Sequence, residues 1–177
     1  MVISRISAFL LAFLLALAPQ IASAKVTLSF YSFSGSVILP GGYPHAYIRL
    51  SGTLDGSDQK VEELYGFTAE STTAAVMKGD TSGLIHEAKP RFLKRKKNNR
   101  HFVVSISDAQ YHRIVNEVKK WRSSVYNLGS RNCLHFVAAV AKIVGIEAAV
   151  PDKLTRRPKA WLNLVGRLNP QLKATEF

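Results

Sequence analysis

The residues best suited to chemistry are Asn132-Cys133-Leu134-His135-Phe136-Val137, which contain the only cysteine in the chain. Apolar residues at helical spacing follow, and they predict a helix with Asn132 as N-cap, Cys133 at its first position and Gly145 as a left-handed C-cap. A thiol at this position meets unpaired backbone amides and the positive end of the helix dipole, which favour the nucleophilic thiolate. The alternative is that Cys133 packs as a small buried hydrophobe, as free cysteines often do.

A thiolate nucleophile needs a base, and histidine is the usual one because its pKa lies near the operating pH. His135 is close in sequence, but two positions along a helix turn the side chain by about 200°, so we expect it to be structural. His45 begins a predicted strand directly after a loop rich in proline and glycine, and it is the candidate base. Its alternative role is that of an ordinary outward-facing polar residue. The remaining histidines lie on a solvent face, beside a basic run or in a loop: His112, His101 and His86.

A third group normally orients the imidazole, and the expected pairing of two strands points to Glu70. The alternating segments 45–50 and 61–70 flank turn residues at 55–58, so they should form a hairpin. The register that puts the apolar residues on one side pairs Leu50 with Tyr65, Ile48 with Phe67 and Ala46 with Ala69. It places Glu70 opposite His45 on the other side. Thr68 or Thr72 takes this place if the register moves by two residues.

The other elements are predicted from periodicity and capping residues. Residues 25–38 indicate one or two strands, 71–83 an irregular connection with one short helical turn, and 101–106 a further strand. Ser107 and Gln110 form a capping box that opens a helix with an apolar stripe. A short terminal helix around Trp161 should cover the core. No internal repeat or shift in composition divides residues 25–177, so we expect a single domain.

The first 24 residues have the pattern of a secretory signal peptide. Arg5 precedes an apolar run over 6–18, and Ala22-Ser23-Ala24 provides a small-x-small cleavage site. We therefore expect cleavage after Ala24 and a periplasmic or secreted protein; the alternative is an uncleaved anchor. A single cysteine cannot form an internal disulfide, so Cys133 would be a free thiol in an oxidising compartment, which calls for a functional explanation.

The chain is strongly basic, with a formal net charge of +12. Such a charge favours anionic partners, namely the carboxylates of a cell-wall polymer, anionic lipid head groups or lipopolysaccharide, and export makes nucleic acid the least suitable. One segment concentrates the positive charge, and it is interpreted as a solvated hairpin tip or loop, or as an anion-binding patch at a membrane surface. Its basic residues are Lys89, Arg91, Lys94, Arg95, Lys96, Lys97 and Arg100.

Two of these motifs resemble a known family. The segment Asn132 to Val137 is similar to the Asn-Cys-x-His-Phe signature of circularly permuted papain-like cysteine hydrolases, a group that includes lecithin:retinol acyltransferase, PPPDE peptidases and NlpC-like cell-wall peptidases. His45-Ala46-Tyr47-Ile48-Arg49-Leu50 resembles the family's His-x-x-Ile-x-Leu strand, and the histidine precedes the cysteine as in permuted members. The resemblance implies an α+β fold, with an antiparallel sheet packed against helices, and an acyl-enzyme reaction. Ser57 stands near where the acyltransferases carry a second histidine, which disfavours lipid acyl transfer.

The sequence therefore predicts an exported cysteine hydrolase, an amidase or peptidase acting on peptidoglycan-type bonds. Its candidate site residues are Cys133 as nucleophile, His45 as base and Glu70 as orienting group. The alternatives are a thioesterase or phospholipase of the same fold, and a non-catalytic basic domain that binds the cell envelope. No clustered cysteines and histidines at metal-ligand spacing and no phosphate-binding glycine loop occur in the sequence, so we expect no metal or cofactor.

Overall fold

The computed structural model describes residues 26–35, 43–70, 75–88, 90–94 and 97–177. The predicted signal peptide, most of the loop before His45, and Lys89, Arg95 and Lys96 of the basic segment lie outside this part of the chain. Within the part described, no helix is long and apolar enough to cross a membrane.

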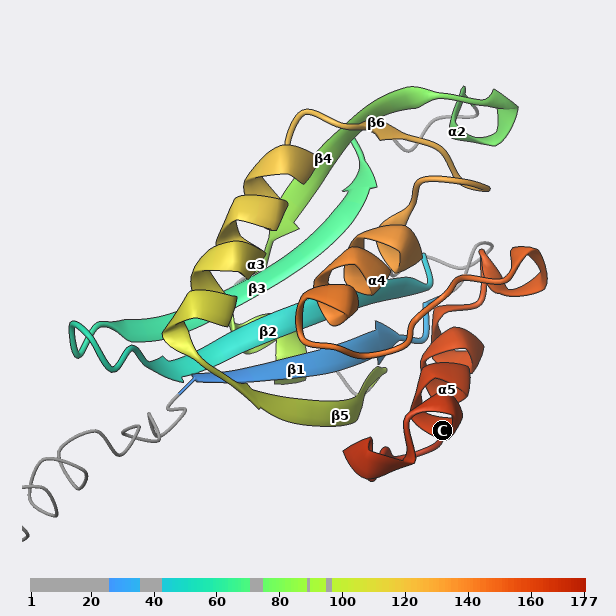
Figure 1. The fold of residues 1–177 in the computed structure, drawn as a ribbon. Coiled ribbons are helices and arrows are strands. Elements are labelled where there is room, and N and C mark those ends of the chain that lie inside the picture. Colours follow the sequence, from blue (N-terminus) through green and yellow to red (C-terminus); the bar gives the residue numbers. More distant parts are fainter. Residues whose placement is uncertain (1–25, 36–42, 71–74, 89, 95–96) are drawn as a thin grey trace, which may run out of the picture.

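Six strands form one antiparallel sheet in the order β5-β1-β2-β3-β4-β6, so the first strand lies between the second and the fifth (Figure 1). The sheet ends in the two-residue strand β6. The strands are β1 (Val26–Phe33), β2 (His45–Thr53), β3 (Lys60–Ala69), β4 (Thr81–Glu87), β5 (Asn98–Ile106) and β6 (Val125–Tyr126).

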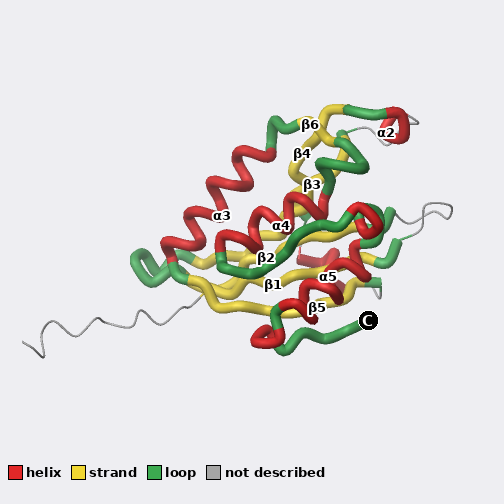
Figure 2. Tube along the Cα trace, turned by 45° about the vertical axis from the view of Figure 1, so that its right-hand side comes forward, coloured by secondary structure: helices red, strands yellow, loops and turns green. Residues whose placement is uncertain are grey.

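Three helices cover one face of this sheet, as Figures 1 and 2 show from two directions. They are α3 (Asp108–Trp121), α4 (Cys133–Ile143) and α5 (Pro158–Leu168), and α2 (Ala75–Lys78) is a single turn between β3 and β4. Short 3-10 helices occur at η1 (Pro90–Lys94), η2 (Asp152–Leu154) and η3 (Pro170–Leu172). The expectation of an α+β fold with an antiparallel sheet packed against helices is confirmed.

The main core lies between the sheet and the three helices. Side chains alternate along a strand, and in β2 those of Ala46, Ile48 and Leu50 point to the helices and are fully buried. The predicted terminal helix is present as α5, and its Trp161 is also fully buried. The predicted start of the helix α3 is confirmed, because Ser107 forms its capping box with Gln110.

The opposite face of the sheet carries a smaller apolar cluster. Tyr47 lies there with Tyr31, Phe33 and Leu64, and Phe92 and Leu93 of η1 pack against these four residues. The basic segment is therefore more than a solvated loop, because η1 anchors it to the sheet. Its residues Arg91 and Lys94 remain exposed.

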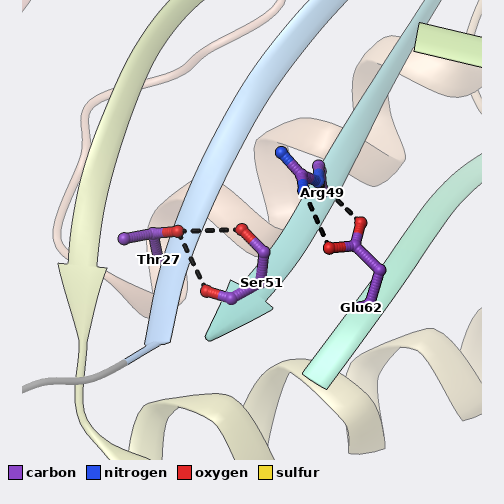
Figure 3. Close-up of polar contacts among 4 residues, drawn as sticks. All are labelled: Thr27, Arg49, Ser51 and Glu62. Atoms are coloured by element: carbon purple, nitrogen blue, oxygen red, sulfur yellow. Dashed lines mark hydrogen bonds and ion pairs between the residues drawn. The ribbon is translucent and has the colours of Figure 1, made fainter. Parts of the chain in front are cut away.

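Polar pairs continue this face toward the other end of the strands (Figure 3). The Thr27 hydroxyl lies 3.0 Å from the Ser51 hydroxyl and donates to the Ser51 carbonyl at 3.0 Å. The Arg49 guanidinium donates two hydrogen bonds to the Glu62 carboxylate, at 2.8 and 2.7 Å. These cross-strand pairs join β1, β2 and β3 on the side away from the helices.

The β2–β3 hairpin is present, but the predicted register is wrong by two residues. Ile48 pairs with Tyr65 and Thr53 with Lys60, so residues 54–59 form the loop between the two strands. Leu54 is buried in the core, and its carbonyl accepts a hydrogen bond from the Asp58 amide at 3.0 Å, so it belongs to the loop and not to the strand. A shift of two keeps every side chain on the same face, so alternation could not detect it.

The strand β4 was not predicted, because its segment was interpreted as an irregular connection and a loop. Its sequence contains Gly83, and Ile85 is its only buried residue, so the apolar alternation that indicates a strand is missing. The strand forms because its backbone pairs with β3, where His86 lies opposite Gly66.

Candidate functional site

The helix α4 begins at Cys133, as predicted, and Asn132 caps it. The Asn132 Oδ1 accepts a hydrogen bond from the Leu134 amide at 2.9 Å. Its Nδ2 donates to the carbonyls of Leu128 and Thr155, at 2.7 and 2.8 Å. Asn132 is almost completely buried, so one side chain holds the cysteine helix, the loop before it and the segment before α5 together.

His135 completes the N-terminal turn and has the structural role expected from its position. The Asn132 amide donates to the Nδ1 of His135 at 3.3 Å, which forms the second half of a capping box. The Nδ1 atom of the His135 ring therefore accepts a hydrogen bond from the backbone at the start of its own helix.

A cavity of about 560 Å³ lies where β2 begins and β3 ends, beside the start of α4. Both Cys133 and His45 line this cavity, but the expected contact between the imidazole and the sulfur is not present, because the His45 ring lies beside Gly66 on the other face of the sheet. Thr68 of β3 and Tyr126 of β6 also line the cavity. Two of the few large apolar side chains exposed on the described surface, Tyr43 and Met77, line it as well.

The Cys133 thiol is buried, and burial raises its pKa to about 11. Three backbone amides act in the opposite direction by hydrogen bonding, those of Ala46, Leu134 and Cys133 itself. Burial outweighs them, so the thiol is neutral at pH 7. The contact with the Ala46 amide places the sulfur directly beside the start of β2.

The imidazole of His45 points to the sheet face opposite α4. It lies over Gly66, where an added Cβ atom would come within 2.5 Å of the His45 Nε2. Its ring centroid lies 6.5 Å from that of Tyr47 on the same face. Burial lowers the pKa of His45 to about 4, with a further decrease from His86 across Gly66. The ring is therefore neutral at pH 7, the protonation state of a base.

Glu70 is exposed at the end of β3, and its amide donates to the Ser82 carbonyl of β4 at 2.9 Å. It lines a separate cavity of about 510 Å³ with Asp80 and Arg122. The register that paired it with His45 is wrong, and continuation of the observed register puts Thr68 opposite His45. Thr68 was the predicted substitute for a shift of two residues.

Comparison of the chain with protein-family models, with curated proteins and with solved structures finds no match. The resemblance to permuted papain-like hydrolases therefore depends on its two short motifs alone.

Two further polar residues of the cavity were not expected from the sequence, Tyr126 and Arg156. Burial raises the pKa of Tyr126, Cys133 raises it further, and Arg156 opposes this increase, so both groups lie within electrostatic range of the Tyr126 hydroxyl. Arg156 lies between two prolines, Pro151 and Pro158, that were interpreted only as breaks. Among the residues that the structure describes, no group of three or more histidine, cysteine or acidic side chains is placed to hold a metal ion.

Proposed function

We propose that this protein is a cysteine hydrolase that uses Cys133 as its nucleophile and His45 as its base. The observation that carries the proposal is that both residues line one cavity, with the sulfur at the first position of α4. The backbone amides around the sulfur offer donors of the kind that stabilise the oxyanion of an acyl-transfer intermediate.

In the proposed reaction, the imidazole of His45 removes the proton from the Cys133 thiol, and the sulfur attacks the carbonyl carbon of an amide. The C–S bond forms, the C–N bond breaks, and the amine leaves with the proton from the imidazolium. Water, deprotonated by the same imidazole, then hydrolyses the thioester and regenerates the thiol. Attack requires the His45 ring to leave its position over Gly66 and turn toward the cavity, because catalytic proton transfer needs hydrogen-bond reach.

The proposed substrates are peptide or amide bonds of an anionic cell-envelope polymer, in a periplasmic or secreted setting after removal of residues 1–24. The whole chain has a formal net charge of +12, and only one positive charge, Arg5, is lost with residues 1–24, so the remaining charge supports an anionic partner. In the described part of the basic segment, Arg91 and Lys94 are exposed on η1 and are available to contact such a polymer or a membrane surface.

The test is the release of new amino groups from purified peptidoglycan by the protein, measured by amine derivatisation and mass spectrometry of the products. Cys133→Ser and His45→Gln should each reduce the rate at least about a hundredfold. A thioester adduct on the single cysteine should also be trapped by rapid acid quenching. Equal product release by wild type and Cys133→Ser would overturn the proposal.

A second candidate, a non-catalytic domain that binds an envelope component in the same cavity, is favoured by the direction of the His45 ring. That ring faces His86 and Gly66, while Cys133 belongs to the main core on the helix side. This candidate predicts binding to peptidoglycan that is the same for wild type and Cys133→Ser, without release of amino groups.

A further inference from the structure

The cavity beside Cys133 has an uneven distribution of charge. Its lining is largely apolar, from residues such as Val76, Leu128 and Leu134, and it includes one arginine and no acidic residue among the described side chains. Arg156 lines it and lies two residues before α5. A ligand seated against the sulfur therefore meets apolar walls and one guanidinium.

Arg156 has no carboxylate partner. All twelve acidic residues of the chain lie in the ranges that the structure describes, yet no ion pair or hydrogen bond among those residues engages its guanidinium. Among the described residues only Arg49, Lys120, Arg122 and Arg167 form ion pairs, and Arg156 is one of the cations that do not. The Arg156 charge is thus free to pair with a group that enters the cavity.

Arg156 and Cys133 are both close to the Tyr126 hydroxyl, which lines the same cavity. Cys133 raises the pKa of Tyr126 and Arg156 lowers it, so both groups interact electrostatically with the Tyr126 hydroxyl. An arginine in this setting discriminates between ligands by charge, since a guanidinium binds carboxylates through a planar fork of donors.

We propose that Arg156 is a specificity-determining residue that selects substrates with a carboxylate close to the carbonyl that Cys133 attacks. This inference deepens the proposed hydrolase function and rests on it for the reaction at the sulfur. The substrate class is an acyl donor whose apolar part contacts Leu128 and Leu134 and whose carboxylate pairs with Arg156. A neutral analogue of the same shape would lose this pairing.

The test compares two alkylating reagents of nearly equal size, iodoacetate and iodoacetamide, which differ in charge. Their second-order rates with the folded protein at pH 9 and low salt are measured by intact mass, and peptide mapping assigns the adduct to the single cysteine. The ratio of the two rates cancels changes in thiolate population that affect both reagents. Arg156→Gln should lower the iodoacetate to iodoacetamide ratio by a factor of about two to five, and added salt should reduce the difference.

Arg157→Gln is the matched control, because this neighbouring arginine is exposed and does not line the cavity. Its ratio should equal that of the wild type. A ratio that is unchanged in Arg156→Gln, or that falls equally in both variants, overturns the inference. So does failure of both reagents to label the folded protein, since the sulfur would then be closed to ligands. Alkylation requires no turnover, so loss of hydrolysis in His45→Gln tests the proposed function separately.

Discussion

The imidazole of His45 occupies the space above Gly66 that any other residue would fill with its own Cβ atom. That atom would lie 2.5 Å from the His45 Nε2, and Tyr47 closes the same space at 3.4 Å. The register that pairs Ile48 with Tyr65 puts Tyr47 opposite Gly66, and His45 lies two positions before Tyr47. Glycine at position 66 therefore leaves room for the His45 side chain, and its own backbone conformation does not favour glycine.

Gly66→Ala should push the His45 ring away from β3. Because burial is the main cause of the low His45 pKa, the pKa should rise from about 4 toward its ordinary value near 6.5. Overpacking should also lower the free energy of unfolding by about 1–3 kcal/mol. Titration of the histidine ring protons by NMR and denaturant unfolding measure the two effects.

Gly56→Ala is the control, because its Cβ would make only an ordinary contact, 3.7 Å from the Asp108 carboxylate. A His45 pKa that stays near 4 in Gly66→Ala would contradict the observed position of the ring. If hydrolysis requires the ring to leave Gly66, Gly66→Ala should retain activity or exceed the wild type.

Cys133 should react with alkylating reagents as a buried neutral thiol that has no imidazolium partner. With a pKa near 11, its rate of alkylation by iodoacetamide should be below that of free cysteine at pH 7 and rise about tenfold per pH unit up to pH 10. Mass spectrometry of the intact chain follows the reaction. A plateau below pH 8 would instead indicate a thiolate paired with an imidazolium.

Asn132→Ala should be more destabilising than the loss of an ordinary N-cap. The cap contributes about 0.5–2 kcal/mol, and two carbonyls, of Leu128 and Thr155, also lose their donor, so we expect about 2–4 kcal/mol in total. Thermal and urea unfolding measure the change. Asn132→Asp retains the acceptor for Leu134 but not the donors, so a loss equal to that of the alanine variant would show that the donors dominate.

The buried His101 should make the protein less stable as the pH falls. Its Nε2 lies 2.8 Å from the Ser32 hydroxyl, and burial is the main cause that lowers its pKa to about 4. The unfolded chain binds this proton near pH 6.5, so the stabilising effect is complete above pH 6.5 and is lost between pH 6.5 and 4. The loss is about 3 kcal/mol for this residue.

His101→Gln removes this proton-binding site, so the slope of unfolding free energy against pH should become shallower over that interval. Urea titrations at several pH values measure the slope. His45 titrates in the same range and leaves a residual slope in the variant. An identical slope in wild type and His101→Gln would show that His101 does not gain its proton on unfolding.

Local signals in the sequence predict the parts of the site that local interactions build. The start of α4 follows from Asn132 and from the apolar spacing after Cys133, and Gly145 adopts the left-handed conformation expected of it, with φ of 78°. The placement of His45 away from the apolar side of its hairpin is also confirmed, because its ring shares a face with Tyr47.

Non-local packing decides what the sequence could not predict. The core side of β2 is the side that α4 covers, so Cys133 contacts the Ala46 amide while the neighbouring His45 ring points to the other face. The hairpin register is set by backbone pairing, and alternation cannot distinguish it from one shifted by two residues. Arg156 carries no motif, and only the fold brings it to the cavity.

The strand order has a consequence for how the chain reaches its native state. β1 is the first described strand, yet its residues pair with residues of β5 that lie 65 to 80 positions later, and α5 packs against both strands. If the chain is threaded across a membrane from its amino end, one hydrogen-bonding edge of β1 stays unpaired until β5, at Asn98–Ile106 of the 177 residues, has emerged. The rate of folding after translocation would then depend on when β5 becomes available to pair with β1. A chaperone that binds the unpaired edge of β1 would raise the yield of folded protein.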